Sequence, residues 1–406
     1  MDIAEMRAAA RRLFDVAVDA ANPGPAVDSW LAAHWRSSGG RLMVLGLGKA
    51  APAMVRSALS RVSADRAICV TNPENATEIA GVEVILGGHP VPDDGSERGG
   101  AALLNAVSRL AADDQVLVLI SGGGSALAVA PADGIAAAEK AEVSRLLLAS
   151  GLDINAMNLV RQNLSQLKGG GLARAAAPAQ VTALVLSDVI GDDLSIIASG
   201  PTEPPAGGRA AAAAVLQDAG LWDRVAPSVR EALAGANAPA VTNAMSHLVG
   251  SNRVSLQAMA ASYPGAVIAD DGLTGDVEDA AARVLAQAAG APGVLLFGGE
   301  TTVRIKGTGR GGRNQELALR VALAAAEIGR PWVFLSGGTD GRDGPTDAAG
   351  GLVDPGSIAR MRSAGVDPLA LLSNNDSYAA LEAAGDLLMI GGTGTNVADV
   401  QVLVLG

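Results

Sequence analysis

The segment 334–350 contains the residue types with which proteins hold phosphate and metal ions. It begins within an apolar run, Trp332–Leu335, and carries five glycines together with Asp340, Arg342, Asp343 and Asp347. Backbone N–H groups can crowd around an anion at glycine, because no Cβ blocks the approach. Carboxylates in such a loop can share Mg²⁺ with phosphate oxygens, and an arginine can clamp a carboxylate or a phosphate. The segment favours phosphoryl transfer; a solvated turn is the alternative, because Gly, Asp and Pro are ordinary turn formers.

A second loop follows the same plan. The apolar run Val116–Ile120 is typical of a strand buried on both faces of a parallel sheet, and it ends in Ser121-Gly-Gly-Gly-Ser125. A glycine loop between a strand and a helix start directs N–H groups and the helix dipole at a phosphate. We therefore expect a phosphate-binding loop made of Ser121, Gly122, Gly123, Gly124 and Ser125. A tight turn without a ligand is the alternative.

Three further glycine loops follow apolar runs. They are Gly46–Ala51, which contains Lys49; Gly298–Thr302, which is followed by the glycine-rich stretch 307–316; and Gly391–Asn396. Ligand sites in α/β sheets gather at the carboxyl ends of strands. Five such loops are hard to ascribe to turns alone, and together they predict an anion-binding site.

Composition limits the class of protein. The chain has 406 residues, a net charge of −12 and 2% aromatic residues, which argues against nucleic-acid binding. No apolar stretch reaches the roughly 18–20 residues of a membrane span, and the first residues do not resemble a signal peptide. The one cysteine, Cys69, lies in an apolar run and is expected in the core. We expect a cytoplasmic protein with no membrane or nucleic-acid partner.

Apolar runs and helical patterns alternate along the chain. The first half has predicted strands at 42–45, 67–70, 82–86, 116–120 and 181–186, and predicted helices at 4–20, 51–59, 99–110, 136–150 and 164–175. Such alternation predicts an α/β fold with a parallel sheet and helices on both faces. The second half has predicted strands at 267–269, 294–297, 332–335 and 401–405, and a helix at 314–325. Irregular sequence at 235–242 predicts two domains, 1–240 and 241–406.

Over nearly its whole length the chain resembles the class II glycerate kinases, or glycerate 2-kinases, with their C-terminal MOFRL domain. The resemblance is carried by ordered motifs: Gly46-Leu-Gly-Lys-Ala50, Gly87-Gly-His-Pro-Val-Pro-Asp93, the 121–127 loop, Leu164–Ala173, Leu186–Asp193, Ala198-Ser-Gly-Pro-Thr202, Gly298-Gly-Glu-Thr-Thr302, Gly312–Glu316 and the segment 334–350. It implies a Rossmann-like N-terminal domain, a smaller α/β MOFRL domain and an active site in the cleft between them. It also implies ATP and Mg²⁺, and phosphorylation of D-glycerate to 2-phosphoglycerate. A homodimer is compatible with the resemblance.

The resemblance points to Lys49 and Arg342, and the chemistry of phosphoryl transfer suggests roles for further residues. Lys49 and Arg342 are expected to be essential, with Asp340 as a third catalytic residue. The metal ligands are expected among Asp188, Asp192, Asp193 and Glu300. We expect the substrate to contact Arg161, His89 and Asp343, with Asp343 also a candidate base. Besides the Ser121–Ser125 loop, we expect the nucleotide to contact Gly46, Gly48, Lys168, Gly312 and Asn314.

Structural roles remain open for several of these residues. Lys49 can cap a helix, Asp192 and Asp193 can cap the helix that follows them, and His89 can satisfy buried backbone groups. Asn314 can act as an N-cap. Arg161 and Lys168, seven residues apart on a predicted helix, can form a solvated face. Gln162 and Asn163 depart from the family pattern, which puts any site role for their side chains in doubt.

Two other functions compete with the kinase. Gly46–Ala51 fits the G-x-G-x-x-A pattern of an NAD(P)H-dependent hydroxypyruvate reductase, but the next strand ends at Asn72 with no acid for a ribose. A non-catalytic protein that binds an anionic metabolite is the other candidate. The many carboxylates near the glycine loops argue against it, because they would repel such a ligand unless a metal bridges them. The sequence contains no Walker A motif.

Overall fold

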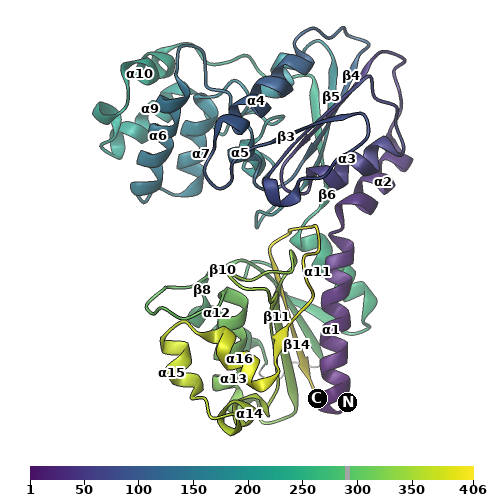
Figure 1. Cartoon of the computed structure of the whole chain (residues 1–406), viewed down its shortest axis with the longest axis vertical. Coiled ribbons are helices and arrows are strands. Elements are labelled where there is room, and N and C mark those ends of the chain that lie inside the picture. The colour runs from purple at the N-terminus through teal and green to yellow at the C-terminus, as the bar shows by residue number, and fades with distance from the viewer. Residues whose placement is uncertain (289–292) are drawn as a thin grey trace. The chain divides into compact units, whose positions relative to one another are not determined.

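The computed structural model of the chain describes residues 1–288 and 293–406, and it divides into two compact units (Figure 1). One unit is continuous, Pro23–Val249. The other combines Met1–Asn22 with Gly250–Gly406. The sequence suggested domains at 1–240 and 241–406; in the structure the first 22 residues belong with the C-terminal part.

The unit Pro23–Val249 is built on a six-stranded sheet with the order β3-β2-β1-β4-β5-β6. Strands β1 to β5 pair in parallel, as the alternation predicted. Every residue of β1 is buried, as expected for a continuous apolar run at the centre of a covered sheet. The strand bounds are β1 Leu42–Leu47, β2 Arg66–Thr71, β3 Val82–Leu86, β4 Gln115–Ile120, β5 Gln180–Leu186 and β6 Ala244–Gly250.

Helices cover both faces of this sheet, as expected. Leu45 and Leu47 pack in a core cluster with residues of α4 and α8. Gly46 faces the opposite side of the sheet and lies against α3. A Cβ added at Gly46 would be 2.5 Å from Val55 Cγ2 of that helix. The helices of this unit are α2 Pro23–His34, α3 Ala51–Leu59, α4 Asp94–Val107, α5 Gly124–Leu127, α6 Ala137–Ala149, α7 Ile154–Asn163, α8 Gly171–Ala176, α9 Arg209–Asp218 and α10 Pro227–Ala234, with 3₁₀ turns η1 Pro73–Asn75, η2 Ile197–Ser199 and η3 Trp222–Arg224.

Helices α6, α7, α9 and α10 form a group beside the sheet with its own hydrophobic core (Figure 1). The predicted helix 164–175 is wrong in its first half, because α7 ends at Asn163 and α8 begins at Gly171. Gly169 and Gly170 lie between them with φ of +54° and +77°, a conformation that ends a right-handed helix. Arg161 and Lys168 therefore do not share a helix.

The second unit has a six-stranded sheet with the order β13-β12-β11-β14-β9-β7. Neighbouring strands pair antiparallel, apart from β7 and β9, which are parallel. The strand predictions at 267–269, 294–297, 332–335 and 401–405 are confirmed. The strands are β7 Ala266–Asp270, β9 Val294–Gly299, β11 Trp332–Gly338, β12 Gly350–Val353, β13 Leu387–Leu388 and β14 Asp399–Leu405, with a separate pair β8 Gly275–Asp276 and β10 Thr301–Thr302.

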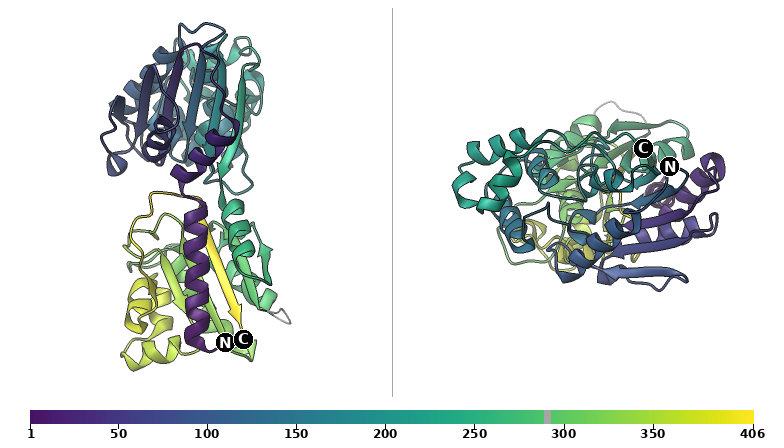
Figure 2. Two further views of the ribbon diagram at one scale, coloured as in Figure 1. Left: turned by 90° about the vertical axis from the view of Figure 1, so that its right-hand side faces the viewer. Right: turned by 90° about the horizontal axis from the view of Figure 1, so that it is seen from above.

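Helix α1, Ile3–Ala20, packs on this second sheet beside α11, Asn252–Ser262 (Figure 2). Phe14 is fully buried, and an added Cβ on Gly337 of β11 would lie 2.6 Å from its ring. Arg7 forms ion pairs with Asp354 and Asp386. These contacts explain why the first residues belong to this unit.

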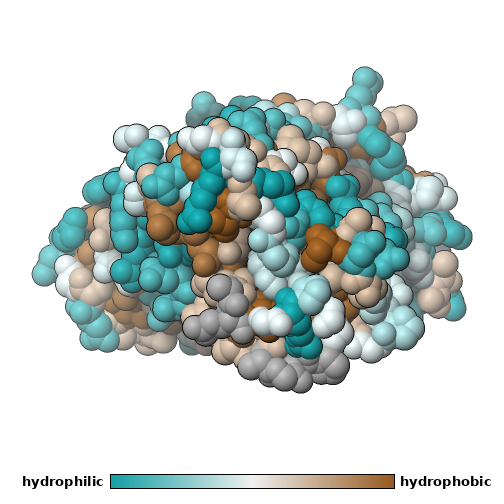
Figure 3. All heavy atoms as spheres, turned by 90° about the horizontal axis from the view of Figure 1, so that it is seen from below, coloured by the Kyte–Doolittle hydropathy of each residue, from teal (hydrophilic) through white to brown (hydrophobic). Residues whose placement is uncertain are grey.

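The remaining helices of this unit pack against one another and the sheet: α12 and α13 are neighbours, and α13 contacts β11 and β12. Their bounds are α12 Val277–Ala288, α13 Arg313–Ala324, α14 Ser357–Ser363, α15 Pro368–Ser373 and α16 Ser377–Ala384, with a 3₁₀ turn η4 Ala325–Ile328. Among the described residues, no helix is both long and apolar enough to cross a membrane. On the face drawn in Figure 3, hydrophobic side chains are interspersed with hydrophilic ones.

Candidate active site

The first two glycine loops lie against each other in the unit Pro23–Val249. Strands β1 and β4 are parallel neighbours, so the loops that follow them emerge at the same edge of the sheet. The N–H of Lys49 donates to Gly122 O at 2.9 Å, and the N–H of Ala50 donates to Ser121 Oγ at 3.0 Å. The Ser121 hydroxyl therefore joins the two loops.

Two glycines in these loops are required by the geometry. Gly48 has a φ of +130°, and an added Cβ would lie 2.2 Å from Ser121 Oγ. Gly123 has a φ of +83° and precedes α5. Helix α5 has only four residues, so the expected contribution of a helix dipole at this loop is small. The backbone N–H groups of Gly122 and Gly123 donate no hydrogen bond to any other described residue.

Lys49 lies beside this second loop. An added Cβ on Gly123 would be 3.2 Å from Lys49 Cγ and 3.3 Å from His89 Cδ2, so both side chains border the glycine. Within the described part of the chain, Lys49 takes part in no ion pair. Burial and the charge of Lys49 lower the pKa of His89. The loop thus combines free N–H donors with a cation and a neutral imidazole.

Asp188 is the predicted metal ligand that reaches this place. It follows β5, and an added Cβ on Gly122 would lie 1.9 Å from its Oδ2. Burial raises the pKa of the Asp188 carboxyl, while Lys49 acts in the opposite direction. Asp193 instead accepts hydrogen bonds from the N–H and the hydroxyl of Ser195, at 2.9 and 2.7 Å. These bonds stabilise a local turn. Asp192 has a φ of +56° in the same turn.

The described residues contain no group of three or more His, Cys, Asp or Glu side chains that could hold a metal ion. Mg²⁺ does not require such a group when it is bound through phosphates, because it keeps one or two carboxylates and several waters. Asp188, a half-buried carboxylate beside two free N–H groups, fits that requirement.

The far end of the second loop is held by Lys168. Its ammonium donates to Ser125 O at 2.6 Å, and the Ser125 and Ser199 hydroxyls are 2.7 Å apart. Ser199 and Ala198 both have positive φ, at +59° and +50°, which is unusual for non-glycine residues. Ser199, which contacts the second loop, was not among the predicted site residues, although its Ala-Ser-Gly-Pro-Thr motif was evident.

Gln162 has a structural role, in line with the doubt raised by its sequence. Its side-chain amide donates to Ser195 O at 2.9 Å and accepts from the N–H of Ala206 at 3.1 Å. Asn163 likewise donates to two backbone carbonyls, those of Leu159 and Gly207.

In the second unit, the segment 334–350 lies beside the last glycine loop. The Thr339 hydroxyl donates to Ala398 O at 2.7 Å, and the N–H of Thr393 donates to Asp340 O at 3.2 Å. The Asp340 carboxylate accepts from the N–H of Arg342 at 3.0 Å. The Arg342 side chain is exposed and makes no hydrogen bond or ion pair with the described residues, so it is available to an anion.

Asp343 is buried, with 2% of its surface exposed, and it accepts from the N–H groups of Asn314 and Gln315 at 3.2 and 2.8 Å. These bonds cap α13, so the geometry favours a structural role over substrate binding. An added Cβ on Gly312 would lie 2.3 Å from the Asp343 carboxyl carbon, which accounts for that glycine. Burial raises the pKa of Asp343 to about 6.

Asn314 is also buried, and its Oδ1 accepts from the Ser336 hydroxyl at 2.6 Å. The neighbouring Arg313 makes two bonds, of 2.6 and 2.9 Å, with Asp399, and lies 3.2 Å from Glu300. Glu300, expected as a metal ligand, is thus paired with an arginine. Asp399 is fully buried and was not predicted, because in sequence it is only the first residue of a strand.

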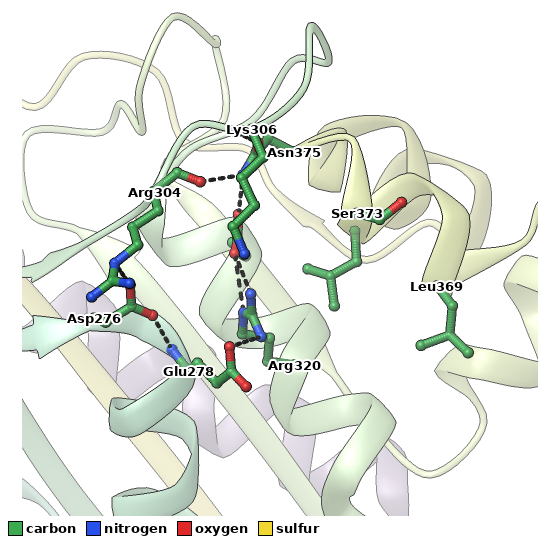
Figure 4. Close-up of a pocket in the computed structure, with 10 residues that line it drawn as sticks. Asp276, Glu278, Arg304, Lys306, Arg320, Leu369, Ser373 and Asn375 are labelled. Carbon is green, nitrogen blue, oxygen red and sulfur yellow. Dashed lines mark hydrogen bonds and ion pairs between the residues drawn. The ribbon is translucent and has the colours of Figure 1, made fainter.

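A separate pocket of about 230 Å³ in this unit contains charged residues that largely neutralise one another (Figure 4). Arg304 pairs with Asp276, and Arg320 pairs with Glu278. None of the predicted site residues lines this pocket.

Comparison with known proteins covers both units. Residues 9–234 match the family model described as "Domain of unknown function (DUF4147)", and residues 293–399 match the "MOFRL family". The chain is 41% identical to a protein from Agrobacterium vitis named "Putative hydroxypyruvate reductase", over 98% of this chain and 94% of that protein. It is 38% identical to "D-glycerate 2-kinase" from Thermotoga maritima, over 89% and 90% of the two chains. The crystal structure of glycerate kinase from Thermotoga maritima superimposes with a TM-score of 0.93 at 35% identity, covering 99% of this chain and all of that one.

Proposed function

The chain belongs to the class II glycerate kinase family and is a kinase, and we propose that it transfers the γ-phosphoryl group of ATP to the 2-hydroxyl of D-glycerate. The observation that carries the proposal is the place where the first two glycine loops meet. There, the N–H groups of Gly122 and Gly123, which have no partner among the described residues, lie beside the Asp188 carboxylate and Lys49, which forms no ion pair with those residues.

This arrangement suits phosphoryl transfer, which depends on alignment and on neutralisation of charge more than on covalent help. The N–H groups of Gly122 and Gly123 would bind phosphate oxygens, and the Lys49 ammonium would stabilise the charge that spreads over the transferring group. Asp188 would hold Mg²⁺, which supplies positive charge to the phosphate oxygens when it is bound. A carboxylate next to a phosphate loop is otherwise repulsive, so Asp188 favours a metal.

Residues of the second unit have proposed roles in the same reaction. Arg342, which is exposed and has no side-chain partner among the described residues, would bind an anionic group of the substrates through two parallel hydrogen bonds. Asp340 fixes the backbone of that arginine and would accept the proton of the 2-hydroxyl. Asp343 and Asn314 would support these residues from the buried cap of α13 rather than contact substrate.

Hydroxypyruvate reduction with NAD(P)H is the second candidate, because a relative at 41% identity carries that name. The geometry of the first glycine loop argues against this second candidate function. Gly46 packs on Val55 of α3, and Gly48 on Ser121, so both glycines are explained by packing without a dinucleotide.

The test measures ADP release from ATP with D-glycerate and Mg²⁺, with and without added enolase. Enolase acts directly on 2-phosphoglycerate, so its conversion of the product without phosphoglycerate mutase identifies the 2-position. ADP release without that conversion would place the phosphate at the 3-hydroxyl. Folded protein that releases no ADP, but oxidises NADH or NADPH with hydroxypyruvate when Mg²⁺ is absent, would establish the reductase instead.

A further inference from the structure

Three positively charged side chains come together in the unit Pro23–Val249, close to the end of the second glycine loop. Lys140 lies on α6, Arg161 on α7, and Lys168 in the segment that follows α7; α6 contacts α7, and both α7 and α5 contact η2. Lys140 and Lys168 are only 5% and 4% exposed, while Arg161 is partly exposed. The whole chain has four lysines, so burial of two of them in one place is a specific feature.

No carboxylate of the described residues forms an ion pair with these side chains. Within the described part of the chain, the Lys140 ammonium has no hydrogen-bond partner, and neither lysine nor Arg161 forms an ion pair. The one partner of the Lys168 ammonium is the Ser125 carbonyl, at 2.6 Å. Burial is the main cause that lowers the pKa of both Lys140 and Lys168. The neighbouring cations add to it: Lys168 and Arg161 lower the pKa of Lys140 further, and Arg161 lowers that of Lys168.

Most other buried charged side chains among the described residues are paired with an opposite charge, and Asp343 accepts from two backbone N–H groups. Asp399 is fully buried but binds Arg313 through two hydrogen bonds, and Asp386 is 1% exposed but pairs with Arg360. Isolated buried charges are costly, so buried ionisable groups are normally paired, bind a ligand or lose their charge; a bound anion would keep the two lysines protonated. The three-cation cluster, Lys140, Arg161 and Lys168, lacks its anion.

We propose that the three-cation cluster binds the carboxylate of the acceptor, a small 2-hydroxy acid; this rests on the proposed kinase function. The reaction brings two anionic groups together, and they need separate partners. The free N–H groups of Gly122 and Gly123, with Lys49, are suited to phosphate. The cluster lies at the other end of the same loop, where the Lys168 ammonium holds Ser125 O, and is therefore placed for the second anion.

Lys140 thereby has a role that no sequence motif suggested. Lys168, which was expected to contact the nucleotide, would instead contact the acceptor, together with Arg161, for which substrate binding was expected. Lys168 would further couple the two ligands, because it contacts the loop that the phosphate would occupy.

The test compares Lys140→Met with the wild-type protein. Methionine keeps an unbranched side chain of similar length and removes the charge. Arg145→Met is the matched control, because it removes a cation from the same helix, where Arg145 is 64% exposed and paired with Glu142. Thermal unfolding is measured without ligand, with D-glycerate, with ADP and with inorganic phosphate, and the KM for D-glycerate is measured in the ADP-release assay.

We expect Lys140→Met to unfold at the same temperature as wild type or higher, because it removes an uncompensated buried charge. The stabilisation by D-glycerate should be lost and its KM should rise at least tenfold, while the stabilisation by ADP stays unchanged. Arg145→Met should match wild type in every measurement. Arg161→Met, at a partly exposed position, is the second variant if Lys140→Met does not fold, and it should show the same loss.

Two results would overturn the inference. A wild-type KM and wild-type stabilisation by D-glycerate in both variants would mean that the cluster binds no acceptor. Loss of stabilisation by ADP or inorganic phosphate, with D-glycerate unaffected, would mean that the anion is a phosphate. Failure of the proposed function is separate: wild-type protein would then release no ADP, while the unfolding measurements would still decide whether D-glycerate binds at Lys140.

Discussion

Substitution of Gly122 by alanine tests whether the loop and Asp188 act together. In the structure a Cβ at this position would lie 1.9 Å from Asp188 Oδ2 and 2.5 Å from its Cγ. Ordinary van der Waals contact begins near 3.4 Å, so the carboxylate must move by about 1.5 Å, or the loop must shift by a similar amount. Because Gly122 does not have a positive φ, the backbone itself accepts alanine.

The magnitude follows from that displacement. Misplacement of a catalytic group by about 1 Å can cost on the order of 10²-fold in rate, so we expect kcat of Gly122→Ala to fall about 100-fold or more. Overpacking at a tight site typically lowers the free energy of unfolding by about 1–3 kcal/mol, which leaves a two-domain protein folded. The loss of activity should therefore exceed what the fraction of unfolded protein explains.

The assay is ADP release at saturating ATP, D-glycerate and Mg²⁺, together with circular dichroism to confirm folding. Gly272→Ala is the control, because the nearest atom to its added Cβ is Asp270 Oδ1 at 3.8 Å. The double variant Gly122→Ala/Asp188→Ala should be no less active than Asp188→Ala alone. Gly122→Ala is expected to act by displacing the Asp188 carboxylate, which Asp188→Ala has already removed. Wild-type activity of folded Gly122→Ala would refute the assignment of Asp188 and of this loop to the reaction.

Three further predictions concern single side chains. Lys49→Met should lower kcat by about 10²–10³-fold, as expected for loss of one donor to the transition state, with little change in the unfolding temperature; a smaller kinetic effect in the ADP assay would contradict its role. Phe14→Ala should lower the free energy of unfolding of the unit that contains Gly250–Gly406 by about 3–5 kcal/mol, because Phe14 is fully buried; calorimetry measures this change. The control is Arg12→Ala, at an exposed position of the same helix. Equal effects of the two substitutions would mean that α1 is not part of that unit's core. Burial and Arg161 lower the pKa of Lys168 to about 7. Between about pH 7 and 10.5 the unfolded chain therefore binds more protons than the folded one. The free energy of unfolding without ligand should rise with pH in that range. Chemical unfolding at pH 7 and 9.5 should show this rise, and a smaller one in Lys168→Met; identical pH dependence in the two proteins would show that Lys168 does not titrate in this way.

The fold was largely predictable because its strands are continuous apolar runs. The predicted strands 42–45 and 116–120 correspond to β1 and β4, and their loops meet because parallel neighbours end at the same edge of a sheet. The helix predicted at 164–175 failed because two glycines with positive φ interrupt it, and helical periodicity alone does not reveal backbone conformation. The boundary at 240 missed α1, since the partner of an amphipathic helix is determined by packing and not by its position in the chain.

The geometry of the candidate site was predictable where local sequence determines it. Glycines at strand ends identified the loops that contain Lys49 and Gly122. For Asp343 the same motifs predicted substrate binding, whereas its hydrogen bonds favour a helix cap; in sequence, an aspartate of a glycine-rich loop has the same appearance in either role. Its two bonds to the N–H groups of Asn314 and Gln315 come from a segment almost thirty residues earlier in the chain, and such long-range pairing has no local signal.

Lys140 shows why residues outside motifs need the structure. In sequence it lies in the alanine-rich segment Ala136–Glu142, where a lysine is an ordinary choice for an exposed helix position. Only the structure shows that Lys140 is 95% buried and that its ammonium has no hydrogen-bond partner among the described residues. Arg161 and Lys168, from other segments of the chain, lie near it. A charge in that environment reduces the stability of the free protein, and a bound anion would remove the penalty. A site of this kind is therefore recognised by a missing partner rather than by a pattern of residues, and it links substrate affinity directly to the stability of the unliganded fold.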